Sequence, residues 1–566
     1  MAALGFAQDY IHRRSSNRGR PRRAAPTVRS GIGYIYFALR VYRTTRKLLW
    51  LLALLFFVVS SPVQNTQSQK QTLTESERRG KEIYLRGTSA SGREIVARLN
   101  DVDVPASALP CGGCHGMRGE GKSEGGVTAG DITWSNLIKP YGHTHPTGRK
   151  HGPFTESSVI RAVVNGVDPS SNDLLVAMPR YKISAEDMAD LLAYLKRIDT
   201  DLDPGLTETN VTVGVVLPSS GALAELGAAV KDVLTAYFDN VNSRGGIFNR
   251  RIDLKVVDAG AGGAGTSTAA ENFAHKEQVF AFVSGLSAGS DPQLAALART
   301  EEIPIVGPST LLPHLENPAN KYLFYLLPGV SEQAMSLVNY AASQPELKRA
   351  NAALVYSDTT LSNAAGNAVV EQARKRGVTI AKKIVFKPEI FDARAIVNEL
   401  KSSNVESLFF FAEGKEQQSL LNVAAAASWS PNFFFLGTLS GRDLSAVSQT
   451  KIFLAFPTVP SDVSSEGIAE FRALQEKYKI APRHTAAQLS AFAAAKVFVE
   501  GLTRAGRDLS REKFITALDT LYDYDTGVTP HLTFGPNRRV GAAGAHIVTF
   551  DPAKKEFTPL GWVNAY

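Results

Sequence analysis

Cys111-Gly112-Gly113-Cys114-His115 is the stretch from which the rest of the chain can be interpreted. Two thiols separated by two residues can add across the two vinyl groups of one haem and form two thioether bonds. The adjacent histidine then lies where it can bind the iron as the proximal ligand. These are the only two cysteines of the chain, so no other thiol competes for the role. The motif therefore predicts one covalently bound haem c, with His115 as an axial iron ligand.

Two other uses of a Cys-x-x-Cys pair fit the surrounding sequence less well. A structural zinc site usually needs a second pair of ligands, and the chain has no further cysteine. A thioredoxin-like redox pair usually opens a helix after a strand, whereas this pair follows Pro110 and precedes a glycine-rich segment. We therefore favour haem attachment.

The segments on both sides of the motif resemble a class I cytochrome c. Residues 73–84 have the pattern of an amphipathic helix that Thr74 or Ser76 could cap. A second helix over residues 184–198 is expected to begin at Ser184, because acidic residues follow in its first turn. The apolar stripe of this second helix comprises Leu191, Leu192, Tyr194, Leu195 and Ile198.

Met178 lies in an Ala-Met-Pro loop just before that second helix. In the cytochromes that the chain resembles, a methionine in this position is the second axial ligand, and its thioether raises the reduction potential. We therefore expect Met178 to bind the iron opposite His115. Met117 is too close to His115 to reach the other haem face, and Met188 has the helical spacing of a core residue.

The segment between the haem motif and Met178 is long and rich in glycine. Its loop at residues 166–169, Gly-Val-Asp-Pro, resembles that of cytochrome c subunits and domains that serve membrane dehydrogenases. The same segment contains His143, His145 and His151. These histidines could form a metal site or contact the haem edge, but a polar surface loop is the simpler interpretation.

Residues 41–64 have the form of a signal peptide or membrane anchor. Basic residues precede the apolar run 48–59, which is short for a membrane span. No Ala-x-Ala cleavage site follows, so anchoring through residues 48–63 stays an alternative to cleavage. Residues 1–40 form a basic extension, which we interpret as a start placed too early or as an arm for an anionic membrane surface. Haem c is attached outside the cytoplasm in bacteria, so motif and leader both indicate the periplasm.

The charge of the chain gives no support for nucleic acid binding. The formal net charge is +8, but residues 1–47 alone carry +10, which leaves −2 for the remainder. With 44% hydrophobic and 20% charged residues, the composition is that of a globular protein.

From residue 210 to the C terminus, apolar runs of strand length alternate with helical patterns. The runs that we interpret as buried parallel strands are 211–217, 252–257, 279–283, 303–306, 352–356, 380–386, 408–412, 433–436 and 452–456. The helical stretches between them include 222–242, 266–275, 363–376 and 393–401. This alternation predicts doubly wound sheets, and about 360 residues are too many for one sheet, so we expect two lobes.

Two stretches of this part resemble type I periplasmic binding proteins of the branched-chain amino acid class. They are residues 213–221, Val-Gly-Val-Val-Leu-Pro-Ser-Ser-Gly, and residues 303–309, Ile-Pro-Ile-Val-Gly-Pro-Ser. In that family two lobes close on a small ligand. The whole chain is thus expected to be multidomain, with a small all-α cytochrome c domain at 70–200 and a two-lobed α/β binding-protein domain at 210–566.

The resemblance also implies candidate ligand-binding residues. Ser287, Ala288, Ser309 and Thr310 match loops in which the family offers hydroxyls and backbone N–H groups to a ligand carboxylate. Ser287 and Thr310 could equally be turn residues. The family's second-lobe Tyr-Gly turn is replaced by the segment 358–362, and the acid that holds a ligand amine has no counterpart. The ligand is therefore not expected to be an ordinary amino acid, and the module could also have become a docking scaffold.

Electron transfer is the function that these features favour. As a non-enzymatic carrier, the chain would pass single electrons from a dehydrogenase, for which the resemblance suggests a quinoprotein, to an oxidase or another cytochrome. The alternative is a solute-binding protein of an ABC import system, or a ligand sensor, with an accessory haem. In a combined hypothesis, ligand binding changes the exposure of the haem or its partner docking, which requires two states that differ at both sites.

Overall fold

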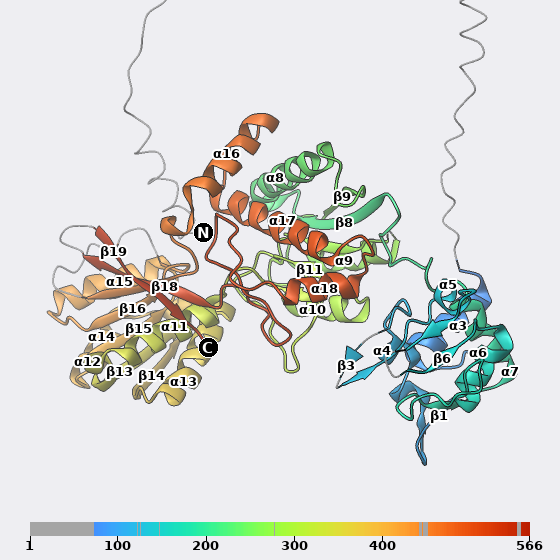
Figure 1. The fold of residues 1–566 in the computed structure, drawn as a ribbon. Helices are drawn as coiled ribbons and strands as arrows, with labels where there is room; N and C mark the ends of the chain where they lie inside the picture. The colour runs from blue at the N-terminus through green and yellow to red at the C-terminus, as the bar shows by residue number, and fades with distance from the viewer. Residues whose placement is uncertain are drawn as a thin grey trace, which may run out of the picture. The chain divides into compact units, whose positions relative to one another are not determined.

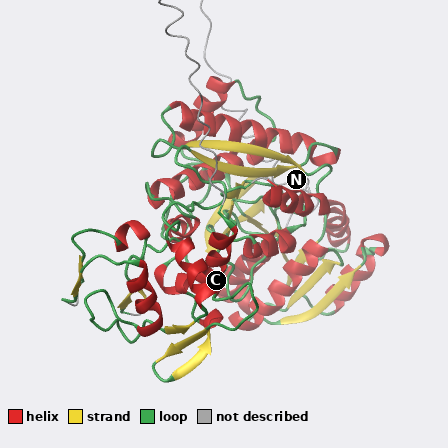
Figure 2. Ribbon diagram, turned by 90° about the vertical axis from the view of Figure 1, so that its right-hand side faces the viewer, coloured by secondary structure: helices red, strands yellow, loops and turns green. Residues whose placement is uncertain are grey.

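The computed structural model describes residues 73–566 except 122, 125, 146–147, 277, 441–443, 445–450 and 552–555. The basic extension and the predicted leader lie outside the described residues. The described chain forms two compact units, one of residues 73–201 and one of Leu202–Tyr566. Each unit is described by itself (Figures 1 and 2).

The first unit is built on two helices, α3 (Glu75–Arg86) and α7 (Ala185–Leu195), which pack against each other. Both begin where the sequence predicts. Thr74 caps α3 by accepting a hydrogen bond from the backbone N–H of Glu77, and Ser184 accepts one from Asp187. The predicted apolar stripe is buried, and Met188 is a core residue as expected.

The two helices approach closely at Gly80 of α3, where a side chain would not fit. A Cβ atom at this position would lie 2.0 Å from the carbonyl oxygen of Asp190 on α7. The Asp190 carboxylate accepts hydrogen bonds from Arg79 at 2.6 and 2.9 Å and from Ser76 at 2.5 Å. A bidentate arginine–carboxylate pair fixes geometry as well as energy, so it holds the two helices at one relative rotation.

The remaining helices and hairpins of this unit lie between α3 and α7 in sequence. They are η1 (Ala106–Ala108), α4 (Cys111–His115), the hairpin β3 (Ser123–Glu124)–β4 (Val127–Thr128), α5 (Trp134–Leu137), the hairpin β5 (His143–Thr144)–β6 (Lys150–His151), and α6 (Glu156–Asn165). Gly166 ends α6 by capping it in the left-handed conformation.

A three-stranded antiparallel sheet accompanies the helices, which an all-α expectation did not include. Its strands are β1 (Val96–Leu99), β2 (Val102–Pro105) and β7 (Arg180–Lys182), in the order β2-β1-β7. The unit is nevertheless mainly helical, and the sheet is short. In this sheet β1, which precedes the haem motif in the sequence, pairs with β7, which follows Met178.

The second unit has two lobes, each with its own sheet. The sheet of the first lobe has the order β12-β11-β10-β8-β9, and all its strands are parallel. Its strands are β8 (Asn210–Leu217), β9 (Arg251–Asp258), β10 (Ala281–Val283), β11 (Ile305–Val306) and β12 (Leu323–Phe324). The helices that pack on it are α8 (Ala224–Ser243), α9 (Ala264–Lys276), α10 (Asp291–Thr300), α16 (Ser465–Tyr478), α17 (Thr485–Ala505) and α18 (Arg511–Asp519).

The sheet of the second lobe has the order β14-β13-β15-β16-β17-β18-β19. Its five parallel strands are β13 (Ala352–Ser357), β14 (Ile380–Phe386), β15 (Ser407–Phe411), β16 (Asn432–Leu436) and β17 (Ile452–Phe456); β18 (Gly544–Asp551) and β19 (Glu556–Asn564) are antiparallel. The helices of this lobe are α11 (Val330–Ser343), α12 (Pro345–Arg349), α13 (Thr360–Arg376), α14 (Ala393–Ser402) and α15 (Gly414–Ala426). The chain passes between the lobes three times, after β12, after β17 and before β18.

All nine predicted strands are present, but two of them are not fully buried. β9 and β14 each have alternating exposed and covered residues. Both strands lie at an edge of their sheet, where one side lacks a neighbouring strand and its covering helix. The expectation that these two runs are buried was wrong for this reason.

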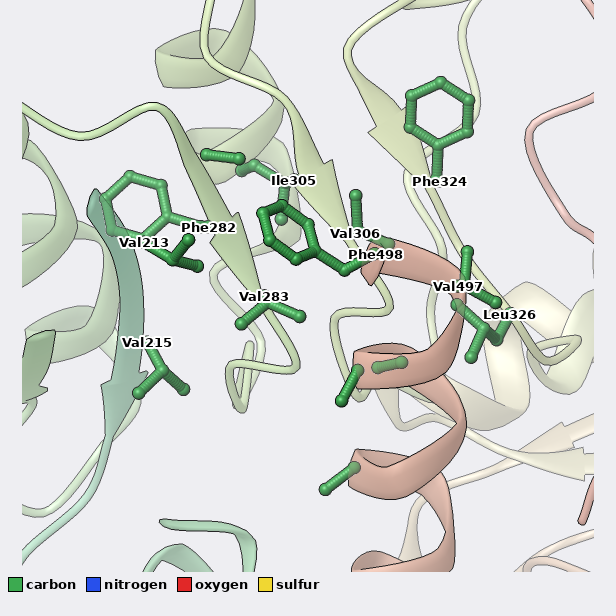
Figure 3. Packing of buried hydrophobic residues seen from close by; sticks show 14 of the residues in the cluster. Val213, Val215, Phe282, Val283, Ile305, Val306, Phe324, Leu326, Val497 and Phe498 are labelled. Carbon is green, nitrogen blue, oxygen red and sulfur yellow. The ribbon is translucent and has the colours of Figure 1, made fainter. Parts of the chain in front are cut away.

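The core of the first lobe forms where α17 packs on the sheet. Val497 and Phe498 of α17 lie among apolar side chains of β8, β10, β11 and β12 (Figure 3). The sequence that supplies α17 follows the second passage between the lobes, so residues far apart in the chain complete one core. The loops that follow β8, β10 and β11 are thereby held at one edge of a rigid sheet.

We predict that Asp190 gives the first unit an acid-sensitive stability. The hydrogen bond from Arg79 lowers the pKa of Asp190, Ser76 adds to this, and burial opposes it only in part. Because the unfolded chain then takes up the proton first, this stability is complete above the ordinary aspartate pKa near 4 and is lost as the pH falls below it. Urea unfolding of the full-length protein at pH 7 and pH 3 measures the effect.

Asp190→Asn should remove much of this pH dependence and destabilise the unit at pH 7. Asp101→Asn, at an exposed acid in the turn between β1 and β2, is the control and should change neither. An Asp190→Asn variant with the wild-type pH dependence would contradict the prediction.

Candidate functional site

The haem motif forms a single-turn helix that is fastened at both ends. The Tyr181 hydroxyl donates to the carbonyl of Leu109 at 2.6 Å, before α4, and the Tyr84 hydroxyl donates to the carbonyl of Gly116 at 2.7 Å, after it. Tyr84 comes from α3 and Tyr181 from β7, so hydrogen bonds from both of these elements position α4. The two thiols are not joined by a disulfide.

His115 presents one ring nitrogen for metal binding. Its side chain is 8% exposed, and Nδ1 lies 2.8 Å from the carbonyl oxygen of Gly130. A carbonyl can only accept, so Nδ1 carries the proton and Nε2 keeps its lone pair. Within the described residues no hydrogen bond to Nε2 is found. This is the arrangement in which a backbone carbonyl orients a ligating histidine.

The electrostatic environment of His115 favours the neutral form that binds a metal. Burial lowers its pKa, and the Gly130 carbonyl and Asp131 offset this only in part. A neutral imidazole can bind iron without first losing a proton.

The cysteines do not have the properties of a redox pair. Cys111 is partly covered and Cys114 is exposed. Burial raises the pKa of the Cys111 thiol to about 11, and the hydrogen bond with Tyr181 offsets only part of this. Catalytic thiols of the thioredoxin type have lowered pKa values, so the raised value is not the one that disulfide exchange requires.

In the described part of the chain, no group of three or more His, Cys, Asp or Glu side chains could hold a metal ion.

Met178 lies in the loop between α6 and β7, and its side chain is half-buried. Its backbone N–H donates to the carbonyl of Leu175 at 3.0 Å, which closes a turn. Leu175 and Val176 in this turn are 56% and 63% exposed. Two free thiols and an oriented neutral imidazole in one helical turn are groups that can hold a haem c. Met178 offers a thioether in a neighbouring loop of the sequence and stays a predicted ligand.

The structure brings His143, His145 and His151 together, which the sequence left open. Their ring centroids lie 5.1–6.3 Å apart, and His151 is only 7% exposed, so it is not a surface residue. The Nε2 atoms of His145 and His151 are 2.9 Å apart. Arg149 donates to His145 Nε2 at 2.9 Å. A guanidinium in this position occupies a nitrogen that a metal ion would need.

In the second unit (Leu202–Tyr566, the binding unit), the two loops that carry the candidate ligand residues are neighbours. The backbone N–H of Ser287 donates to the carbonyl of Ser309 at 3.2 Å. Ala288 and Ser309 are exposed, Thr310 is half-buried and Ser287 is buried. Both loops follow the carboxyl ends of parallel strands, β10 and β11, which is where α/β sheets bind ligands.

Asp291 is a residue of this region that the sequence did not reveal. Its carboxyl group is 3% exposed and accepts a hydrogen bond from the Thr310 hydroxyl at 2.9 Å. Burial raises the pKa of Asp291, and Thr310 and Ser287 offset part of this rise. The Thr310 hydroxyl also accepts from the backbone N–H of Leu312. Both hydrogen-bonding directions of Thr310 are thus used inside the protein, which favours the turn-residue interpretation for it.

Comparison with known proteins gives two family matches on this chain. Residues 210–555 match the family described as periplasmic binding protein, and residues 106–199 match the family described as cytochrome c. The first match covers more than half of the chain.

Curated relatives and solved structures agree with the larger match. The chain is 23% identical over 317 residues to the Leu/Ile/Val-binding protein BraC3 of Rhizobium johnstonii, which covers 55% of this chain and 84% of that protein. It is 25% identical over 304 residues to Leu/Ile/Val-binding protein homolog 3 of Brucella melitensis, covering 52% and 80%. A putative branched-chain amino acid ABC transporter structure from Rhodospirillum rubrum aligns with a TM-score of 0.50 at 17% identity, covering 62% of this chain and all of that one. At this identity the structure shows the fold alone.

We predict that Thr310→Val lowers the free energy of unfolding of the binding unit by about 1–2 kcal/mol. The substitution removes the hydrogen bond that the Thr310 hydroxyl donates to the buried Asp291 carboxyl and the one that it accepts from the Leu312 N–H, and it puts an apolar methyl group beside both polar groups. Chemical unfolding of the full chain followed by circular dichroism measures the change.

Ser309→Ala is the matched control, because Ser309 is exposed and its removal should change the unfolding free energy by less than about 0.5 kcal/mol. Equal effects of the two substitutions would show that the Asp291 contact does not stabilise the loop.

Proposed function

The chain belongs to the periplasmic binding protein family and carries a cytochrome c domain ahead of that module, and on this basis we propose that it is an exported monohaem electron carrier. The binding module would then add recognition of a small ligand to a one-electron transfer protein. We expect no bond-making chemistry of the chain's own, since both kinds of domain are typically non-catalytic.

The environment of His115 is the observation that carries the proposal. Its Nδ1 is hydrogen-bonded to the Gly130 carbonyl, its Nε2 has no hydrogen-bond partner among the described residues, and both motif thiols belong to the same helical turn. Haem, when bound, supplies an iron that alternates between the ferrous and ferric states. In this proposal Cys111 and Cys114 hold the group covalently, and His115 and Met178 are its axial ligands.

Exposure of Cys114 supports exchange of electrons with partner proteins. Cys114 is exposed, so a haem that it held covalently would have the attached edge where a partner could approach it. We propose a dehydrogenase of the quinoprotein class as donor and an oxidase or cytochrome as acceptor. Residues 70–200 would make these contacts as a domain, and residues 210–566 would form the binding module.

The proposed location is the periplasm. Haem c is attached outside the cytoplasm, and the binding-protein family points to the same compartment. None of the helices in the part of the chain that the structure describes has the length and apolarity to cross a membrane. Cleavage of the leader at 41–64, or anchoring through 48–63, concerns residues outside that part.

Covalent haem attachment provides the direct test of the proposal. We predict that protein matured in a host that attaches haem c has the intact mass of the chain plus one haem. Cys111→Ala with Cys114→Ala should lose the added mass, since no other thiol can form a thioether. Met178→Ala is the control, because it should keep the covalent haem while losing the sulfur ligand. Protein without covalent haem despite competent maturation would contradict the proposal.

Solute binding is the second candidate function, and the family match favours it. The relatives of this chain are named for Leu, Ile and Val binding. In this chain Ala288 and Ser309 are exposed at the carboxyl ends of β10 and β11, where a ligand carboxylate could be bound. The module would then serve an ABC import system or act as a sensor. Loss of the ligand, with the module kept as a docking scaffold, is the remaining alternative.

A thermal-shift screen separates these alternatives. We predict that one class among branched-chain amino acids, short carboxylates and alcohols raises the unfolding midpoint of the binding unit. A ligand present at about 100 times its Kd should stabilise the unit by about 2.7 kcal/mol. A screen in which no compound shifts the midpoint would favour the scaffold.

A further inference from the structure

The loop at residues 166–178 carries Met178 but has no helix or regular strand of its own between α6 and β7. An axial methionine must keep its sulfur within bonding distance of the iron, so the loop needs other means of support.

The first half of the loop is wrapped around the buried carboxylate of Asp168. This side chain is fully buried and accepts hydrogen bonds from the backbone N–H groups of Ser170 and Asn172, each at 2.9 Å. Arg149 donates to the same carboxylate at 2.7 Å, and Arg161 donates to the Asp168 carbonyl at 2.6 Å. These contacts fix the entrance of the loop but lie several residues before Met178.

The second half of the loop is bridged by the side chain of Arg180. Its Nη2 donates to the carbonyl of Leu174 at 3.1 Å, and its Nη1 donates to the carbonyl of Met178 itself. One planar guanidinium thus donates hydrogen bonds to the carbonyls at both ends of the turn that contains the methionine. A lysine could not span the two carbonyls in this way, because its ammonium is a single point of charge.

Arg180 is itself held on both sides. Its backbone is part of β7, where it pairs with Arg98 of β1. Its guanidinium lies directly against Gly166, where a Cβ atom would be only 1.6 Å from Nε. The glycine that ends α6 therefore also provides the space in which this side chain lies.

We propose that Arg180 is a positioning residue that keeps Met178 in place as the axial ligand. The proposal rests on the assignment of Met178 under the proposed function. Arg180 donates hydrogen bonds to the carbonyls of Met178 and of Leu174, four residues earlier. Because its own backbone belongs to β7, these bonds hold the turn in a fixed position relative to the sheet. Without it the turn keeps two backbone hydrogen bonds, from the Met178 N–H to the Leu175 carbonyl and from the Leu174 N–H to the Gly166 carbonyl, but the Met178 carbonyl loses the guanidinium that holds it.

The experiment uses the full-length protein with covalent haem and measures how readily imidazole displaces the sulfur ligand of the oxidised iron. Arg180→Gln should raise the affinity for imidazole about tenfold, the effect expected from losing a pair of hydrogen bonds. It should also weaken the sulfur–iron absorption band and lower the reduction potential, while the haem stays covalently attached. Arg180→Lys should fall between Arg180→Gln and the wild type, and it keeps the test available if Arg180→Gln does not fold.

Arg98→Gln is the matched control, because Arg98 is the β1 partner of Arg180 and makes only a surface ion pair with Asp103. It should leave the imidazole affinity unchanged. In a Met178→Ala background, Arg180→Gln should have no further effect on that affinity, since the sulfur that it positions is absent.

Three results would overturn the proposal, each in a distinguishable way. Equal imidazole affinities of Arg180→Gln and Arg98→Gln would show that Arg180 does not position the ligand. An undiminished effect in the Met178→Ala background would show that Arg180 acts on something else. If the wild type and Met178→Ala already bind imidazole equally well, the assignment of Met178 fails, and the role of Arg180 fails with it.

Discussion

The close crossing of α3 and α7 is the constraint on which the cytochrome unit depends. Gly80 allows the two helices to touch, and the Arg79–Asp190 pair fixes their rotation. Tyr84, one turn further along α3, reaches the end of α4 and so places the haem motif relative to the same helix pair. The loop of Met178 leads into β7 and then into α7. Both proposed iron ligands are therefore positioned from one rigid frame.

Local patterns in the sequence predicted most of the fold, and the missing parts depend on distant pairing. The caps at Thr74 and Ser184 and the strand runs follow from rules that act within a few residues. The antiparallel pairs of β1 with β7 and of β17 with β18 join segments far apart in the chain, which no local pattern encodes. Burial of β9 and β14 was overestimated because position at a sheet edge is a property of the whole sheet.

The residues of the candidate sites likewise include some that a local pattern indicated and others that depend on distant contacts. The motif itself indicated Cys111, Cys114 and His115, because the spacing reflects the chemistry of haem attachment. Gly130, Asp291 and Arg180 act through contacts that the sequence does not show. Some signals were present, such as an aspartate before a proline at the start of a helix for Asp291, and an arginine directly after Met-Pro for Arg180.

Arginines that donate hydrogen bonds to backbone carbonyls recur in both units. In the first lobe, Arg511 is 8% exposed and donates to carbonyls just before β10 and β11, whose far ends carry the candidate ligand loops.

We propose that this chain carries one electron on a haem with histidine and methionine ligands. The decisive measurement is a potentiometric titration of the full-length haem protein, followed by visible absorption. We expect one reversible one-electron transition, with a sulfur–iron band in the oxidised form and a lower potential in Met178→Ala, since the thioether favours ferrous iron. An irreversible titration, or a potential that Met178→Ala leaves unchanged, would contradict it.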